Sequence, residues 1–433
     1  MGEKSITVIG AGLAGVEAAL QIANRNVVVD LYEMKKIRKS PAHKSDDFAE
    51  LVCSNSLRSD SLENAVGLMK AEMRLLKSEV IEAADKCRVP AGSALAVDRN
   101  MFSSYLTEKV RKNPLITIHE EEMKKIPEGI VIIATGPLTD GELASSITKI
   151  TGQEALYFYD AVAPIIEFDT IDMNVAYYKN RYDKGDGMYI NCPMDKDEYD
   201  AFYNALIDAK CAPIHDFEMK VFEGCMPVEE MARRGYETLL YGPMKPVGLE
   251  RDEKRPYAVV QLRQDDLAGT LYNIVGFQTH LLFSEQKKLI RMIPGLKDAK
   301  IVRYGVTHRN SYVKAPEVLL STYQMKNNNN VFIAGQLSGV EGYVESIASG
   351  LVAGINAYRL FSRFEPLRFP LETAIGSQAN YLEFASPSQF QPMNANFGLF
   401  PALDMKYKKR DKKGLLAKRS METMEEFIKA VKP

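Results

Sequence analysis

Residues 6–33 read ITVIGAGLAGVEAALQIANRNVVVDLYE and decide the fold of the N-terminal region. The apolar start predicts a strand, and Gly10, Gly12 and Gly15 then form a G-x-G-x-x-G turn before a segment with helical periodicity. Glycines at these positions allow a tight turn, a close approach of the backbone to a pyrophosphate, and close packing of helix on strand. The stretch therefore predicts a dinucleotide site in which the helix N-terminus faces the phosphates.

Three further features extend this site. Glu33 ends the second predicted strand, where a carboxylate accepts hydrogen bonds from ribose hydroxyls. The apolar run 130–134 leads into Thr-Gly-Pro, and the run 331–335 leads into a glycine-rich turn and a helix predicted from about Tyr343 to Leu360. Both patterns are typical of backbone that passes close to a flavin dinucleotide. We expect FAD, with contacts from Gly10, Gly12, Gly15, Glu33, Gly136, Gly335, Gln336, Gly342 and Tyr343.

The middle of the chain has a different character. Between about Leu156 and Phe277 the apolar runs are short and tyrosines are frequent, which predicts a mixed insertion. No second G-x-G-x-x-G occurs, so a separate nicotinamide domain is not expected. The predicted class is α/β: a two-dinucleotide-type Rossmann FAD-binding domain with an inserted α+β domain. We expect the FAD-binding domain at 1–180 and 278–433, the latter with a C-terminal helical segment, and the substrate domain at 181–277.

Net charge, cysteine spacing and the length of the apolar runs exclude several classes of protein. The 433 residues have a formal net charge of -2, which shows no global basic excess for nucleic acid. Five cysteines without C-x-x-C or zinc spacing favour a reducing compartment and no bound metal. With no signal peptide and no apolar run near ~18 residues, we expect a cytoplasmic protein away from membranes. The basic run from Lys406 to Arg419 predicts a solvated helix face, with a nucleic-acid contact as the alternative.

Two cysteines are candidates for chemistry. Cys225 lies in FEGCMPVEEMARR, residues 222–234, where Pro227 suits a first helical turn and two glutamates follow it. A thiol at or next to a helix N-cap has a lowered pKa, so this pattern favours a reactive cysteine. Cys53 lies in a polar loop ahead of a long amphipathic helix predicted from Leu62 to Lys86. For Cys53, function and plain burial stay equally open on these grounds.

These segments together resemble one family, the folate- and FAD-dependent RNA uracil-5-methyltransferases that make the T-loop ribothymidine of tRNA. The matching stretches run from residue 10 to about 398, and the most specific are AELVCSNSLRS around Cys53 and FEGCMPVEE around Cys225. The carboxymethylaminomethyluridine-forming tRNA flavoproteins are similar in the glycine turn and the late AGQ segment, but less so around the cysteines. A similar enzyme of some AT-rich genomes acts on large-subunit ribosomal RNA, so both RNA targets stay open.

The resemblance implies a reaction. Uracil C5 is a poor nucleophile, and a thiolate that adds at C6 activates it. The one-carbon unit would come from methylenetetrahydrofolate and reach C5 directly or through a methylene adduct on flavin N5, with FAD reduced by NAD(P)H as hydride source. Cys225 is expected as nucleophile and Cys53 as base or second thiol, with the reverse assignment open. We expect His280, His308 and Arg309 at the folate. The alternatives are an RNA-binding protein that keeps FAD as a structural element and an ordinary flavin oxidoreductase.

Overall fold

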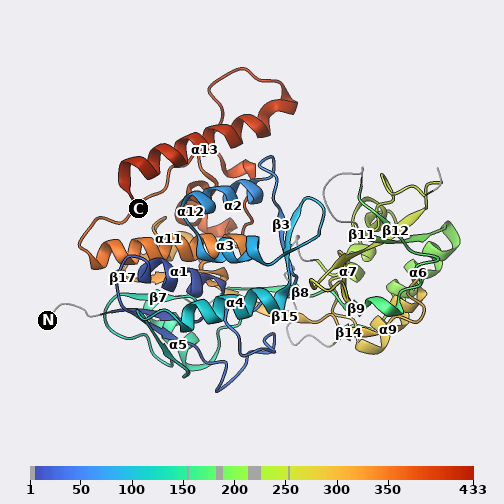
Figure 1. Ribbon diagram of the computed structural model, residues 1–433, viewed down its shortest axis with the longest axis horizontal. Helices are drawn as coiled ribbons and strands as arrows, with labels where there is room; N and C mark the ends of the chain where they lie inside the picture. The colour runs from blue at the N-terminus through green and yellow to red at the C-terminus, as the bar shows by residue number, and fades with distance from the viewer. Residues whose placement is uncertain (1–4, 154–155, 182–188, 213–225, 252–253) are drawn as a thin grey trace.

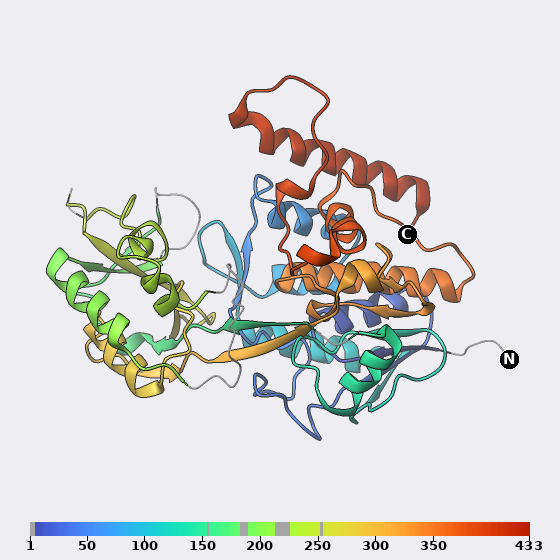
Figure 2. The same ribbon diagram turned by 180° about the vertical axis from the view of Figure 1, so that it is seen from behind.

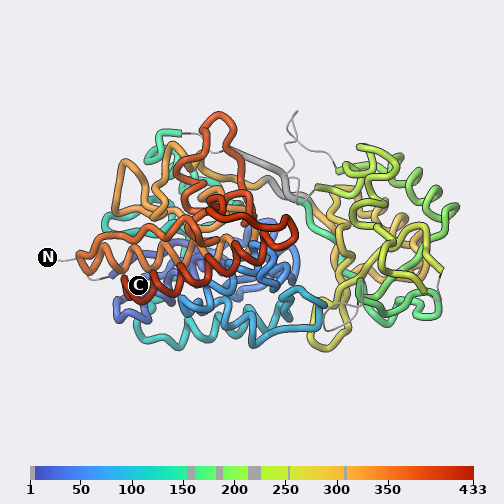
Figure 3. Tube along the Cα trace, turned by 90° about the horizontal axis from the view of Figure 1, so that it is seen from above, coloured from blue at the N-terminus to red at the C-terminus, as the bar shows by residue number. Residues whose placement is uncertain are grey.

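The computed structural model describes residues 5–153, 156–181, 189–212, 226–251 and 254–433. The described residues form two lobes that lie side by side, each with its own apolar core (Figure 1). The larger lobe contains both ends of the chain, and the smaller lobe is built from its middle (Figure 3).

The larger lobe is organised around a six-stranded sheet. Its strand order is β16 (Gln324–Met325), β17 (Asn328–Ile333), β7 (Val131–Ile133), β1 (Ile6–Ile9), β2 (Val29–Tyr32) and β6 (Ile116–His119). All neighbours pair in parallel except β16 and β17, and Thr7 on β1 pairs with Asp30 on β2 and with Val131 on β7. The apolar runs of β1 and β7 are buried because parallel sheets are covered on both faces. The predicted α/β class is confirmed.

Two helices far apart in sequence pack together over this sheet. They are α1 (Leu13–Ala23) and α11 (Tyr343–Phe361), and the latter spans almost the residues predicted for it. Small side chains allow the approach. A Cβ at Gly350 would lie 2.2 Å from the backbone oxygen of Ala14, and one at Gly354 would lie 2.9 Å from Cα of Ala18. The late segment therefore returns to the glycine turn.

The long helix predicted from Leu62 to Lys86 is instead two helices, α2 (Ala65–Leu75) and α3 (Glu79–Lys86). Between them Lys77 has φ +59°, and the hydroxyl of Ser78 accepts a hydrogen bond from the backbone nitrogen of Ile81 at 3.2 Å as an N-cap. The buried carboxylate of Glu17 on α1 also accepts hydrogen bonds from Ser78 Oγ and Val80 N, both at 2.8 Å. This tertiary contact and the N-cap start a second helix, although the apolar periodicity alone predicts a single continuous helix.

The smaller lobe contains an antiparallel sheet and covering helices. Its strand order is β10 (Tyr177–Lys179), β11 (Tyr189–Met194), β12 (Ala258–Gln264), β13 (Leu271–Ile274), β9 (Ile165–Glu167) and β14 (Ile301–Arg303). Among its helices, α6 (Lys196–Asp208) contacts both α9 (Phe283–Met292) and α7 (Val228–Arg233). Strand pairing and helices together make it an α+β unit. Its sheet draws on residues 165–303, a wider range than the expected 181–277, so the domain boundaries stay a proposal.

One antiparallel pair of strands connects the lobes. The strands are β8 (Leu156–Ala161) and β15 (Thr307–Tyr312), with Ala161 paired to Thr307, and they cross from one lobe to the other (Figure 2). The middle of the chain is therefore inserted between them, as predicted.

The C-terminal helices pack against α2 in the larger lobe. Both α12 (Ala374–Phe384) and α13 (Lys412–Val431) contact α2, and α13 lies across the top of the lobe in Figure 1. The carboxylate of Glu72 on α2 is completely buried and accepts hydrogen bonds from Ala374 N at 2.7 Å, Ile375 N at 2.9 Å and Ser420 Oγ. Among the described residues, no helix is long and apolar enough to cross a bilayer.

Candidate cofactor cleft and active site

The glycine turn performs three separate tasks. Gly10 has φ +97°, and a Cβ there would lie 2.6 Å from the backbone oxygen of Ala134. A Cβ on Gly15 would lie 1.8 Å from the backbone oxygen of Gly10, so this glycine lets α1 pack on the turn. A Cβ on Gly12 would meet nothing within 4 Å, because this residue faces an open cleft. Gly12 therefore leaves room for a ligand to approach the backbone.

The cleft lies at the carboxyl ends of the parallel strands and has an empty volume of about 1210 Å³ including its mouth. Glu33 stands on its wall just after β2, where Oε2 accepts a hydrogen bond from Ala11 N at 2.8 Å. The residues expected at the cofactor that line the cleft are Gly10, Gly12, Glu33, Gly136, Gly335, Gln336 and Tyr343. The other two expected residues do not line the cleft. Gly15 lets α1 pack on the glycine turn, and Gly342 is the N-cap of α11 with φ +108°.

A polar loop supplies lining residues that sequence reasoning did not single out. Arg38, Ser40, His43 and Glu50 all face the cleft. Arg38 donates hydrogen bonds to Asp140 at 2.7 and 3.0 Å and to Glu122 at 2.5 Å, so the loop is tied to other residues that line the cleft. The segment has no regular period, so only its position after Glu33 indicated that it borders the cofactor.

The Cys53 loop meets the cleft at Tyr343. The phenolic oxygen of Tyr343 accepts hydrogen bonds from the backbone nitrogens of Cys53 at 2.6 Å and Ser54 at 3.2 Å, while its ring lines the cleft. Burial of the phenol raises the pKa of Tyr343, so the hydroxyl stays neutral. Cys53 itself is partly exposed, whereas Cys87 is buried in the core. The loop thus presents Cys53 beside the cofactor cleft.

Three arginines hold the same loop. Arg99 donates to the backbone oxygens of Leu51 at 2.9 Å and Cys53 at 3.3 Å, and Arg303 donates to that of Val52. Arg263 donates to Ser54 Oγ at 2.7 Å and to the Asn55 side chain at 3.2 Å. Burial lowers the pKa of Arg263 and of Arg303, and the nearby charge of Arg99 lowers the pKa of Arg303 further.

These arginines come from distant parts of the chain. Arg99 begins α4 (Arg99–Arg111) in the larger lobe, whereas Arg263 lies on β12 and Arg303 on β14 of the smaller lobe. Arg99 also pairs with Asp265 of the smaller lobe at 2.9 Å. The Cys53 loop is therefore held by both lobes in a strongly cationic setting, which suits a thiolate or a bound polyanion. No local sequence signal marks these arginines.

The second candidate, Cys225, lies outside the described residues. Helix α7 starts three positions later at Val228, and its N-cap is Pro227. The docking of the helix is described: Val228 N donates to Gln278 O at 2.7 Å, and Glu229 accepts from His280 N at 2.8 Å. The segment that follows Cys225 is thus fixed against the strand-like residues 278–280.

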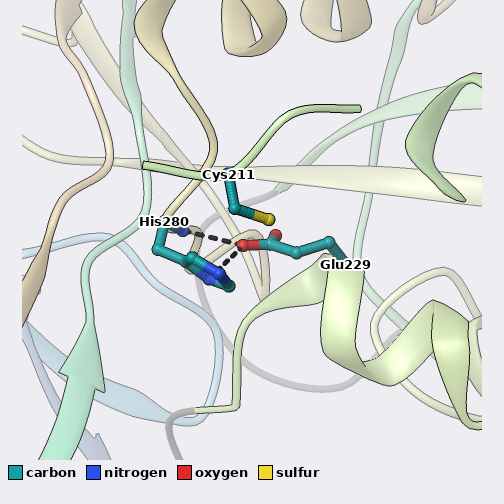
Figure 4. A group of neighbouring side chains, drawn as sticks. All are labelled: Cys211, Glu229 and His280. Atoms are coloured by element: carbon teal, nitrogen blue, oxygen red, sulfur yellow. Dashed lines mark hydrogen bonds and ion pairs between the residues drawn. The ribbon is translucent and has the colours of Figure 1, made fainter. Parts of the chain in front are cut away.

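The residues expected at the folate are not brought together as a described group. The side chain of His280 is 5 % exposed and lies beside Glu229 and Cys211 (Figure 4), and it is not among the described residues that line the cofactor cleft. His308 and Arg309 lie on β15, where His308 pairs with Asp160, but the side chains of both lie outside the described part of the chain. Their role at the folate stays a prediction.

Comparisons with known proteins identify the relatives of this chain. Residues 5–365 match the family model described as glucose inhibited division protein A. A protein of Listeria monocytogenes is 60 % identical over 97 % of this chain and 98 % of its own length, and one of Enterococcus faecalis is 57 % identical over 99 % of each. Both are named methylenetetrahydrofolate–tRNA-(uracil-5-)-methyltransferase TrmFO. A solved structure of Aquifex aeolicus GidA superposes with a TM-score of 0.69 at 18 % identity, covering 97 % of this chain and 76 % of that one, which shows a shared fold.

Proposed function

The chain belongs to the glucose inhibited division protein A family and, within it, to the TrmFO proteins, and we propose that it methylates C5 of a uridine in tRNA with methylenetetrahydrofolate and FAD. The observation that carries this proposal is the meeting of the cofactor cleft and the Cys53 loop at Tyr343. A reactive thiol beside a flavin site is the combination that this chemistry needs.

The residues of the cleft fit FAD. Gly12 leaves room for the pyrophosphate next to the N-terminus of α1, whose backbone N–H groups face it. Glu33 would accept hydrogen bonds from the ribose, and Gly335, Gln336 and Tyr343 would border the far end of the cofactor. Bound FAD, reduced by NAD(P)H, supplies the hydride that turns a one-carbon unit into a methyl group.

The protein side of the reaction needs a nucleophile and a base. The Cys225 thiolate adds to C6 of the uracil, which makes C5 an enolate-like carbon able to take the one-carbon unit from methylenetetrahydrofolate. The Cys53 thiolate then removes the C5 proton, which lets tetrahydrofolate leave the one-carbon unit as an amine and gives a methylene at C5. Addition of hydride to that methylene completes the methyl group and expels the Cys225 thiolate from C6, which restores the ring. Arg99 and Arg303 next to the Cys53 loop favour its thiolate. The reverse assignment of the two cysteines stays open.

The proposed reaction also needs a folate donor and an RNA substrate. We expect folate against the flavin with His280, His308 and Arg309 as candidate contacts; for His280 this competes with its contacts to Glu229 and Cys211. The names of the relatives support tRNA over ribosomal RNA as the substrate.

The basic segment near the C-terminus offers positive charge to RNA. The lysines at 406–413 are exposed, whereas Arg419 donates hydrogen bonds to the backbone oxygens of Pro401 and Ala402. An enzyme of tRNA would act in the cytoplasm.

The deciding experiment measures methylated uridine in RNA. Nucleosides of purified tRNA and ribosomal RNA from a deletion strain are quantified by mass spectrometry, with wild-type and Cys225→Ala chains returned on a plasmid. We expect 5-methyluridine to vanish from tRNA in the deletion strain and to return with the wild-type chain only. Loss from ribosomal RNA would select the alternative target. Loss from neither would leave a flavin oxidoreductase of small molecules or an RNA-binding flavoprotein.

A further inference from the structure

A second group of reactive side chains lies in the smaller lobe, outside the cofactor cleft. Cys211 Sγ, a carboxylate oxygen of Glu229 and a ring nitrogen of His280 all lie within 4.8 Å of one another. Figure 4 shows the three side chains converging from separate segments. None of the three is among the residues that line the cleft. The proposed methyl transfer uses Cys225 and Cys53 and assigns no role to Cys211.

The backbone fixes the three segments independently of any ligand. Cys211 and Leu281 form an antiparallel bridge, supported by hydrogen bonds from Ala212 N to His280 O at 2.8 Å and from Leu282 N to Lys210 O at 3.0 Å. Helix α7, which carries Glu229 in its first turn, is tied to the same segment through Val228 N and Gln278 O. The three donor atoms are therefore held close together before anything binds.

The carboxylate of Glu229 is fully buried and oriented by neighbours. Its Oε2 accepts a hydrogen bond from the Thr279 hydroxyl at 2.8 Å, and its Oε1 accepts one from His280 N at 2.8 Å. Metal-binding carboxylates are commonly held by hydrogen bonds of this kind, which aim the remaining lone pairs. The Glu229 carboxylate is therefore held in one position, and each of its oxygens keeps a lone pair that could bind a metal ion.

The imidazole of His280 is close enough to both partners to act as the nitrogen ligand of a metal ion. Its Nδ1 lies 2.7 Å from Oε1 of Glu229, yet this buried nitrogen makes no aligned hydrogen bond to any of the described residues. A buried polar atom without an aligned partner costs free energy. At 2.7 Å the nitrogen and the carboxylate oxygen are too close for an ion to fit between them, so metal binding requires the two side chains to move apart and the ring to give up its proton.

We infer that Cys211, Glu229 and His280 form a site for a divalent transition-metal ion of the zinc class. The donors are one thiolate, one imidazole and one carboxylate, which is a set that Zn²⁺ accepts and Mg²⁺ or Ca²⁺ disfavours. Tetrahedral zinc places its ligand atoms about 3.4 Å apart, which small side-chain rotations reach from the present separations. Three protein ligands leave a fourth position for water, and the partly exposed Cys211 provides the entry.

One neighbour competes with the ion. Arg233 Nη2 donates to Cys211 Sγ at 3.5 Å, and its other nitrogen pairs with Glu230. The guanidinium is well exposed on the last turn of α7, so it can turn away to solvent when a cation takes its place. Removing this side chain should therefore strengthen metal binding, an effect that a plain ion-paired thiol would not produce.

Zinc binding to tag-free, FAD-loaded protein tests the site. After treatment with a chelator and dialysis against micromolar Zn²⁺, we expect about one zinc per chain in wild type and in the matched control Cys87→Ala, whose thiol lies in the other core. Cys211→Ala and Glu229→Gln should lose the metal, and Arg233→Leu should bind it at least as tightly as wild type. Flavin content and circular dichroism confirm that each variant is folded.

Cobalt gives a readout of the sulfur ligand. Difference spectra with Co²⁺ should show a thiolate-to-metal charge-transfer band in wild type and Cys53→Ala, and none in Cys211→Ser. The inference is overturned when wild type retains no zinc, or when Cys211→Ala retains as much zinc as wild type. Faster alkylation of Cys211 without any bound metal would identify an ion-paired reactive thiol instead and would equally overturn it.

Discussion

The phenolic oxygen of Tyr343 lies 2.6 Å from the backbone nitrogen of Cys53, a residue 290 positions earlier in the chain. Tyr343 is the first residue of α11 and lines the cofactor cleft, so one side chain connects the late helix, the cleft and the cysteine loop. The position of Cys53 relative to a bound flavin therefore depends on this hydrogen bond.

Tyr343→Phe should separate cofactor binding from turnover. The ring still lines the cleft, so FAD content should stay near that of wild type, while the amides of Cys53 and Ser54 lose their acceptor. An unpaired, partly buried donor costs about 1–3 kcal/mol, so we expect methyl transfer to fall about tenfold or more. The measurement is folate-dependent methyl incorporation into tRNA, with Tyr358→Phe on the same helix as control. Wild-type turnover in Tyr343→Phe would show that the loop is placed by its arginines alone.

Gly12 and Gly15 should respond differently to the same change. Gly12→Ala adds a methyl group in open space, so the protein should fold and lose FAD as the methyl meets the pyrophosphate. Gly15→Ala forces a contact of 1.8 Å with the Gly10 oxygen and should destabilise the lobe itself. Absorbance of the flavin and thermal unfolding distinguish the two outcomes. Full flavin occupancy in Gly12→Ala would contradict the assigned phosphate position.

The two cysteines should differ in trapping experiments. RNA with 5-fluorouracil at the target stalls after one-carbon transfer, because fluorine cannot leave C5 as a cation. We expect Cys225→Ala to form no covalent RNA adduct on denaturing gels, and Cys53→Ala to form one while turning over slowly. An adduct in Cys225→Ala together with none in Cys53→Ala would invert the assignment. Adducts in both variants would argue against covalent catalysis by these thiols.

The buried carboxylate of Glu72 should make stability depend on pH. Burial raises the pKa of Glu72 from 4.5 to about 7, against the hydrogen bonds that it accepts from Ser420, Ala374 and Ile375. Between these values the folded chain holds a proton that the unfolded chain releases, so the free energy of unfolding falls as pH rises, by about 3 kcal/mol. Urea unfolding at pH 5 and pH 8 should show this fall in wild type and a smaller one in Glu72→Gln. Equal slopes would mean that Glu72 does not titrate in this range.

Local patterns predicted much of the fold. The glycine turn, β1, α1 and α11 all follow from periodicity and end signals, since these depend on neighbouring residues. The break at Lys77 and Ser78 did not, because the Glu17 carboxylate that supports it lies 61 residues away from Ser78. The arginines around Cys53 and the group Cys211, Glu229 and His280 are likewise assembled by tertiary structure. Spacing rules for metal sites read short segments and so pass over such a group.

The pairing of β17 with β7 in the larger sheet has a consequence for synthesis of the chain. This strand pairs with β7, yet about 195 residues separate Ile133 from Asn328, and the entire smaller lobe lies between them. At about 5–20 residues per second, the exposed edge of β7 waits roughly 10 to 40 s on the ribosome for its partner. During that interval the smaller lobe emerges complete and can fold first. The cleft for the cofactor is then among the last parts of the molecule to form.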